Sequence, residues 1–287
     1  MSEQSEIPNA SRKLFFGLFV FPLVIAVGMA VMLCTVVLLT HEKDTPESLI
    51  GAIKKSSPAH RWQKAFELSN ELNRVSSSLR QDAVMKEIIQ LLQDSENYDA
   101  KTRSFMALAL SHFHDRRAVE ALQKSLKDPH EDVRLYALWS LGALGAKEAV
   151  PDILPYIHSE APDTRKTAVY VLGAIGETSV RDELRPLLSD PVSDVRWNTA
   201  LALARLRDAS GLDILIKMMR RTELSNEYRL SEPQIESVMS NAAKGLALIR
   251  TPEAIKILTS VSRSDSNLKV RQAALNALHP PTGKINS

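Results

Sequence analysis

A period of 31 residues in the middle of this chain limits the folds that it can adopt. An arginine recurs four times at this spacing, and a leucine follows each arginine by seven positions. The members of this pattern are Arg103, Arg134, Arg165 and Arg196, with Leu110, Leu141, Leu172 and Leu203. A repeat of this length is one supersecondary unit, which must stack on its neighbours to bury its apolar face.

Each unit is expected to hold two helices. A second, shorter apolar segment separates the repeated ones, as at residues 150–157. Pro129 interrupts the chain before a new unit, and Gly145 and Gly176 stand where a left-handed helix end is expected. No strand-like alternation of apolar and polar residues appears. The sequence therefore predicts an all-α fold, an α-solenoid (superhelix) of about seven helical hairpins over residues 46–279.

The residues that recur in the two middle units also carry a family resemblance. They are Asp132, Val133, Arg134, Ala137, Leu141, Gly142, Leu144 and Gly145, then Arg165, Ala168, Leu172, Gly173, Ile175 and Gly176. This pattern resembles the HEAT-like repeats of the phycobilisome-lyase type, whose units read approximately D-x-x-V-R-x-x-A-x-x-x-L-G-x-L-G. The resemblance implies a HEAT-like solenoid. Scaffolds, chaperones and a few enzymes share that fold, so it leaves the function open.

An uncharged stretch near the start predicts a membrane anchor. Residues 14–39 contain no charged side chain, and a helix of that length reaches about 39 Å, more than the roughly 30 Å of hydrocarbon in a bilayer. A secretory signal peptide has a shorter apolar core and a cleavage site, which the residues after Leu39 do not offer. We therefore expect a single transmembrane helix that stays in the protein, with Cys34 facing lipid or another span.

The charges beside this stretch predict its orientation. The pair Arg12 and Lys13 favours a cytosolic tail at residues 1–13, and residues 40–45 then form a linker to an extracytoplasmic solenoid, periplasmic if the source is bacterial. The opposite orientation stays open, because Lys and Arg counts on the two sides nearly tie.

The later repeats depart from the period. Asn241 aligns with Asn198 at a spacing of 43, which places twelve extra residues between Thr222 and Pro233. The capping-box spacing of Ser231 predicts that a helix restarts there and leaves residues 223–230 as a projecting loop, either a binding element or an idle insertion. After the last helix, residues 280–287 are expected to be disordered.

Composition excludes several functions. The net charge of +2 is too balanced for a nucleic-acid-binding domain, and the absence of cysteine after Cys34 excludes disulfides and thiolate metal sites there. No nucleophile elbow, phosphate-binding loop or HExxH motif occurs. His112 and His114 are two apart on a helix, so they point away from each other and cannot share a metal. We expect no enzyme activity, no cofactor, no metal and no small-molecule substrate.

The repeated arginine stands in the first helical turn, where the helix dipole disfavours a cation. An aspartate two residues earlier can cap its own helix and meet an arginine of the adjacent unit. This predicts a structural ladder, with a row of anion-binding arginines as the alternative. The ladder comprises Asp132, Arg134, Asp163, Arg165, Asp194 and Arg196.

Aromatic residues recur on the face opposite the predicted core. Relative to the repeated arginine, positions −1, +3, +4, +7 and +10 are apolar and share one helix face, whereas +5 lies opposite and +1 and +2 nearby. These positions hold Phe105, Leu108, Tyr136, Trp139, Tyr170, Trp197 and Leu201. By the HEAT-like resemblance this face lines the concave groove, so we expect an exposed stripe that binds a partner. The alternative is that the side chains lie flat and half-buried between helices.

Together these features predict a membrane-anchored, single-pass, non-enzymatic scaffold or adaptor. Its solenoid is expected to bind a segment of a protein partner, part of a membrane complex, in the concave groove. The alternative, which rests on the family resemblance, is a cofactor-handling lyase or chaperone related to the bilin lyases.

Overall fold

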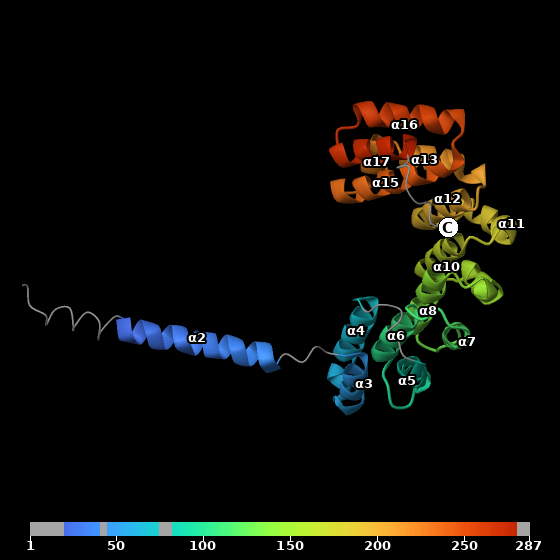
Figure 1. The fold of residues 1–287 in the computed structure, drawn as a ribbon. Helices are drawn as coiled ribbons and strands as arrows, with labels where there is room; N and C mark the ends of the chain where they lie inside the picture. The colour runs from blue at the N-terminus through green and yellow to red at the C-terminus, as the bar shows by residue number, and fades with distance from the viewer. Residues whose placement is uncertain (1–19, 41–44, 75–81, 280–287) are drawn as a thin grey trace, which may run out of the picture. The chain divides into compact units, whose positions relative to one another are not determined.

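The computed structural model describes residues 20–40, 45–74 and 82–279, which separate into two units, Met1–Thr45 and Pro46–Ser287 (Figure 1). In the first unit, α2 (Phe21–Thr40) is an uncharged helix whose side chains at 21–36 are exposed. No helix of the described residues is both long and apolar enough to cross a membrane. The transmembrane helix expected at 14–39 is therefore not found; residues 14–19 lie outside the described part, as do 1–13, 41–44 and 280–287.

The second unit is a stack of helical hairpins, which confirms the predicted α-solenoid (Figure 1). One helix of each hairpin belongs to an inner layer, in which each helix packs on the next. The inner layer comprises α4 (Pro58–Arg74), α6 (Ala100–Leu110), α8 (Glu131–Leu144), α10 (Pro162–Ile175), α12 (Ser193–Arg205), α15 (Glu232–Ile249) and α17 (Leu268–Leu278).

The other helix of each hairpin belongs to an outer layer. Its members are α3 (Pro46–Lys55), α5 (Asp82–Gln93), α7 (Arg116–Ser125), α9 (Val150–Ile153) with η4 (Leu154–His158), α11 (Arg181–Leu184) with η6 (Arg185–Ser189), α13 (Leu212–Met218) and α16 (Pro252–Ser264). The two middle members change from α to 3₁₀ geometry where Pro155 and Pro186 occur, because proline lacks an N–H and clashes with the carbonyl four residues earlier. Short 3₁₀ turns, η3 (Lys147–Ala149), η5 (Thr178–Val180) and η7 (Ala209–Gly211), lead into three of the outer helices.

The repeated leucines and glycines hold the positions that the period predicts. Leu110, Leu141, Leu172 and Leu203 are fully buried. Gly145 and Gly176 end their helices in the left-handed region, with φ of 63° and 78°. In the next two units an arginine takes the same place, Arg207 with φ of 62° and Arg250 with φ of 52°. A side chain in this conformation costs roughly 1–2 kcal/mol.

The repeated arginines do not pair with the predicted aspartates; they bind the loops between successive units instead. Arg165 forms an ion pair with Asp190, at 2.9 Å from Nε to Oδ2, and Arg103 does the same with Asp128; both carboxylates belong to the loop before the next inner helix. Arg196 reaches the same loop from the other side, where its Nη1 donates to the carbonyl oxygens of Asp190 and Pro191 at 2.6 and 3.0 Å. The loop at Asp190 is thus held between the arginines of two successive units.

The predicted aspartates lie elsewhere. Asp132, Asp163 and Asp194 are exposed in the first helical turn, and the N-cap residues before them, His130, Ala161 and Val192, make no side-chain cap bond. Among the residues that the structure describes, Asp163 pairs only with Lys166, at 2.7 Å. The arginine side chain is long enough to reach back past its own aspartate to the preceding loop, which explains why sequence proximity does not produce the pair.

One unit lacks the loop carboxylate. Ser159 occupies the place of Asp128 and Asp190, and its hydroxyl accepts the same local bond, from the amide of Ala161 at 3.3 Å. Arg134 still donates to the carbonyl oxygens of Asp128 and Pro129, at 2.8 and 3.0 Å. Within the described residues, however, it has no ion pair of the kind that Arg103 and Arg165 form.

The insertion is folded onto the unit. It contains α14 (Arg221–Asn226), whose Leu224 is buried, and Arg221 pairs with Asp265 at 2.7 Å. The predicted capping box of Ser231 and Gln234 is confirmed. The later repeats share a cluster of buried apolar residues that includes Leu215, Leu224, Met239 and Leu246, which we call the second core cluster. The projecting loop expected over 223–230 is wrong, because Leu224 belongs to this cluster and Tyr228 packs against it.

Candidate binding groove

All seven residues of the predicted stripe belong to the inner layer, on α6, α8, α10 and α12. Their burial differs. Trp139 is 44% exposed, whereas Trp197 is only 9% exposed. The other five are half-buried, as the alternative of side chains lying between neighbouring helices describes: Phe105, Leu108, Tyr136, Tyr170 and Leu201.

Phe105 of α6 is the centre of a ring cluster. Its ring centroid lies 5.6 Å from that of Tyr136 on α8 and 5.4 Å from that of Phe66 on α4, both edge to face. Trp62 stacks at 6.4 Å from the same ring, and the ammonium of Lys101 lies 3.3 Å from the Trp62 centroid. Offset and edge-to-face geometries are those that aromatic pairs favour. The cluster joins three inner helices into one aromatic surface.

The surface continues along the inner layer. Trp139 follows Tyr136 by three residues on α8, and its ring centroid lies 4.7 Å from that of Tyr170 on α10. The guanidinium of Arg205 on α12 lies 4.8 Å from the Tyr170 centroid. We call the set Trp62, Phe66, Phe105, Tyr136, Trp139 and Tyr170 the aromatic row.

Trp62 and Phe66 were not among the residues of the predicted stripe. The first hairpin has no repeated arginine to set the register, so their face could not be assigned from the period. Their spacing of four residues, which places both side chains on one helix face, was the available signal. Phe66 is 45% exposed, comparable to Trp139.

Trp197 does not join the row, which corrects its place in the predicted exposed stripe. Its ring lies 5.0 Å from that of Tyr228, edge to face, and it belongs to the second core cluster. Tyr228 comes from the insertion. The regular repeats contain no counterpart of it, so they could not indicate that a ring packs on Trp197.

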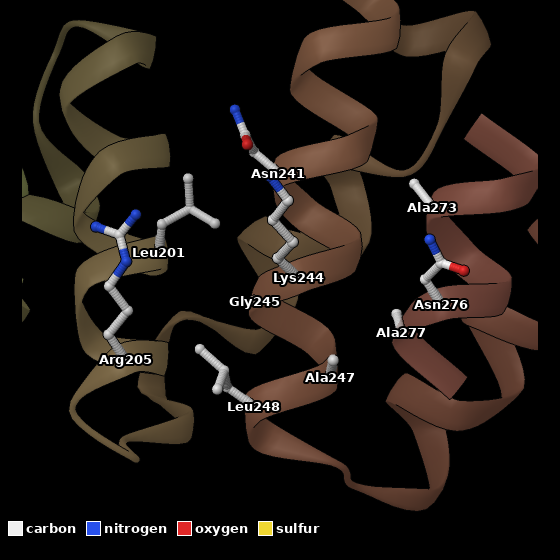
Figure 2. A pocket seen from close by; sticks show the side chains of 10 residues that line it. All are labelled: Leu201, Arg205, Asn241, Lys244, Gly245, Ala247, Leu248, Ala273, Asn276 and Ala277. Carbon is white, nitrogen blue, oxygen red and sulfur yellow. The ribbon is translucent and has the colours of Figure 1, made fainter. Parts of the chain in front are cut away.

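Beyond the row, the inner layer is hollowed between α12, α15 and α17 (Figure 2). The groove has a volume of about 480 Å³. Its lining residues are Leu201, Arg205, Asn241, Lys244, Gly245, Ala247, Leu248, Ala273, Asn276 and Ala277. Of these only Leu201 was predicted as a binding residue. We call this the cationic groove, because Arg205 and Lys244 are its charged residues.

The described residues hold no candidate metal site. No group of three or more histidine, cysteine, aspartate or glutamate side chains among them could hold a metal ion. His112 and His114 lie in a shallow depression with Asp115 and Arg117, where Arg117 pairs with Asp115 at 2.8 Å. The hydrogen bonds that Asp115 accepts from Arg117 lower the pKa of its carboxyl group to about 2, because they outweigh the opposing effect of burial. The described residues of the inner face offer apolar and charged side chains to a ligand.

Comparisons with known proteins agree with this architecture. A family model of HEAT repeats matches residues 85–163 and 150–232. The complex of CpcE and CpcF of phycocyanin lyase from Nostoc sp. PCC7120 is similar in structure, with a TM-score of 0.56 and 21% identity over 83% of this chain and 95% of that chain. The YibA protein of Escherichia coli has a TM-score of 0.50 and 13% identity over 82% of this chain and 93% of that one. No curated protein matches in sequence, and identities this low show the fold alone.

Proposed function

Because this chain belongs to the family of HEAT-repeat proteins, we propose that it is a non-enzymatic adaptor whose inner layer binds a segment of a protein partner. The observation that carries this proposal is Trp139, a large aromatic side chain that is 44% exposed within a row of rings from four successive helices. Exposed aromatic surface of this kind is uncommon without a partner, and tryptophan and tyrosine dominate the energy of interfaces.

The way the rings are held supports binding over simple packing. Tyr170 is fixed between Trp139 and the guanidinium of Arg205, and Phe105 between Phe66 and Tyr136. Rings that are already immobilised lose little conformational freedom when a partner docks. A segment lying along the row would therefore contact rigid anchors on consecutive units.

A cofactor-handling lyase or chaperone is the second candidate. Its support is the similarity in fold to the CpcE and CpcF complex of phycocyanin lyase, and a row of half-exposed rings could also stack on a flat conjugated ligand. The two functions separate on one observation. A chromophore that remains with the purified protein and absorbs visible light favours the lyase-like function, whereas a colourless protein that retains a protein partner favours the adaptor.

Trp139→Ala is expected to release the partner without unfolding the protein. Loss of an aromatic anchor from an interface costs about 2 kcal/mol or more, or roughly a thirtyfold loss of affinity. The folding penalty should stay well below the roughly 3–5 kcal/mol of a core ring, because nearly half of this side chain is already in solvent. Purification of the full-length protein in mild detergent, with mass spectrometry of what it retains and a thermal melt, measures both effects.

Ile255→Ala is the matched control. Ile255 is 40% exposed on α16 of the outer layer, so its truncation removes exposed apolar surface away from the row. Equal loss of the partner in both variants, or a large fall in the melting temperature of Trp139→Ala, contradicts a binding role for the row.

The location at a membrane remains part of the proposal. Its support is the uncharged sequence of residues 14–39, part of which lies outside the described residues. The full-length protein is expected to stay with the membrane pellet after carbonate extraction, and protease added to intact vesicles is expected to reach the solenoid only from the extracytoplasmic side. Release into the supernatant by carbonate contradicts the anchor. Digestion from the cytosolic side alone reverses the orientation.

A further inference from the structure

The inner layer changes its chemistry between its first and last helices. The aromatic row occupies α4 to α10, and the cationic groove follows on α12, α15 and α17. Figure 2 shows Leu201 and Arg205 on one side of the groove, Asn241, Lys244 and Leu248 on the central helix, and Asn276 on the third. Apolar side chains and positive charges therefore line the same hollow.

This end of the inner layer lacks negative charge. None of the residues that line the cationic groove is acidic, and α17 contains no carboxylate at all. The carboxylates of α12 and α15, Asp194, Glu232 and Glu236, all lie in the first half of their helices, while Arg205 and Lys244 lie further along. Among the described residues no carboxylate pairs with Arg205 or Lys244, although most arginines of the unit are paired or hydrogen-bonded. Neither charge is therefore neutralised by a carboxylate of the described residues, although the guanidinium of Arg205 also lies over the Tyr170 ring.

A second observation places more positive charge at the same helix ends. Arg207 and Arg250 adopt the left-handed conformation that Gly145 and Gly176 take in earlier units. The strain of roughly 1–2 kcal/mol exceeds the roughly 0.3–1 kcal/mol that a cation gains at a helix carboxyl end. Arg207 also donates to the carbonyl oxygen of Leu248, a groove residue, at 2.9 Å. An arginine thus takes a strained backbone position that glycine occupies in earlier units, and it keeps a positive charge at the carboxyl ends of α12 and α15.

We propose that the cationic groove binds an acidic segment of a protein partner, with a carboxylate at Lys244 and Arg205 and an apolar side chain against Leu201 and Leu248. This rests on the proposed function and names the chemistry of the partner. Charge complementarity requires an anionic ligand. The apolar walls require an apolar group beside that charge. The amide of Asn241 can donate to and accept from a peptide backbone, and that of Asn276, whose Oδ1 accepts from Gln272 Nε2 at 2.9 Å, can donate.

Binding of a defined peptide to the full-length protein in mild detergent tests the proposal. The probe is a short, fluorescently labelled peptide with capped ends that alternates glutamate and leucine. Lys244→Glu is expected to weaken its binding at least about tenfold in fluorescence anisotropy, because an attractive charge becomes repulsive. Lys256→Glu makes the same change on α16 of the outer layer, where the side chain is exposed, and should change the affinity by less than about twofold.

Arg207→Gly separates a binding role from a structural one. Glycine relieves the left-handed strain, so the variant should melt at a temperature equal to or above that of the unaltered protein. Its affinity for the glutamate and leucine peptide should nevertheless fall severalfold. Ala273→Leu adds bulk to the groove without changing its charge, so it should weaken binding of the peptide as well.

Four results overturn the proposal. The first is that a peptide with lysine in place of glutamate binds equally well, and the second is that Lys244→Glu and Lys256→Glu weaken peptide binding equally. The third is that phosphatidylserine vesicles bind in preference to the peptide and in a manner that depends on Lys244. The fourth is that the peptide binds more tightly after deletion of residues 280–287, which would make the chain's own tail the occupant. Failure of the adaptor function looks different. If Trp139→Ala releases the cellular partner while Lys244→Glu retains it, the adaptor function is supported and the acidic segment is contradicted. If instead the peptide binds in a manner that depends on Lys244, but Trp139→Ala retains the cellular partner, only the role of the aromatic row is contradicted.

Discussion

Asp128→Ala is expected to lower the free energy of unfolding by about 3 kcal/mol or more. The variant leaves the guanidinium of Arg103, which is 2% exposed, without its carboxylate, and it removes the bond that the Asp128 side chain accepts from the amide of His130 at 2.9 Å. Removal of one partner from a buried ion pair is far more destabilising than loss of an exposed pair, because the remaining charge stays desolvated. Denaturant unfolding of the variant against the unaltered protein measures the difference.

Asp132→Ala is the matched control, four residues along. Asp132 is exposed in the first turn of α8, so its loss should change stability by less than about 0.5 kcal/mol. The reciprocal variant Ser159→Asp should add stability, because it supplies the carboxylate that Arg134 lacks. If Asp128→Ala and Asp132→Ala lowered the free energy of unfolding equally, the result would contradict the role given to the loop carboxylate and favour the ladder that the sequence predicts.

The ion pair of Arg103 and Asp128 also makes the stability of the protein depend on pH. Burial opposes the ionisation of Asp128, but the hydrogen bonds from Arg103 and the His130 amide outweigh it, so the pKa lies below its ordinary value of 3.8. A depressed pKa contributes stability that is present above the unfolded-state pKa and lost as the pH falls through the folded-state pKa. The unaltered protein should therefore lose stability below about pH 4. Asp128→Ala should lose less of its remaining stability over that range.

Gly173→Ala is expected to destabilise the protein by about 2 kcal/mol, although alanine favours helices over glycine by about 1 kcal/mol. A Cβ at Gly173 would lie 2.6 Å from the Cβ and 2.7 Å from the Cα of Ala202. The second contact is backbone, so relief requires α10 and α12 to move apart. Because these two helices pack along the inner layer, their separation should also disturb the contact between Arg205 and Tyr170. Calorimetry of the variant measures the change in melting temperature.

Gly51→Ala is expected to raise the melting temperature in the same experiment. Gly51 lies within α3, and a Cβ there meets no atom within 4 Å. The variant should gain up to about 1 kcal/mol from helix propensity alone. A gain at both positions would mean that α10 and α12 are not held at the close approach described here.

The aromatic row was only partly predictable. The period placed Phe105, Tyr136, Trp139 and Tyr170 opposite the apolar core, because the angle between helix positions is set by local geometry alone. How much of each ring is exposed depends on the neighbouring helix, so Trp139 and Trp197 differ although both satisfy the pattern. Trp62 and Phe66 escaped detection because the first hairpin lacks the repeated arginine.

The sequence by itself determined the hairpin repeat, the buried leucines and the left-handed glycines, since each follows from residue spacing within one helix or its end. Only the tertiary structure decided which groups meet across the stack. Arg165 finds its carboxylate in a loop 25 residues away, and Tyr228 of the insertion covers Trp197. The cationic groove combines side chains of three helices, among them Arg205, Lys244 and Asn276. Such contacts depend on how the units stack, and the spacing of residues within one unit does not contain that information.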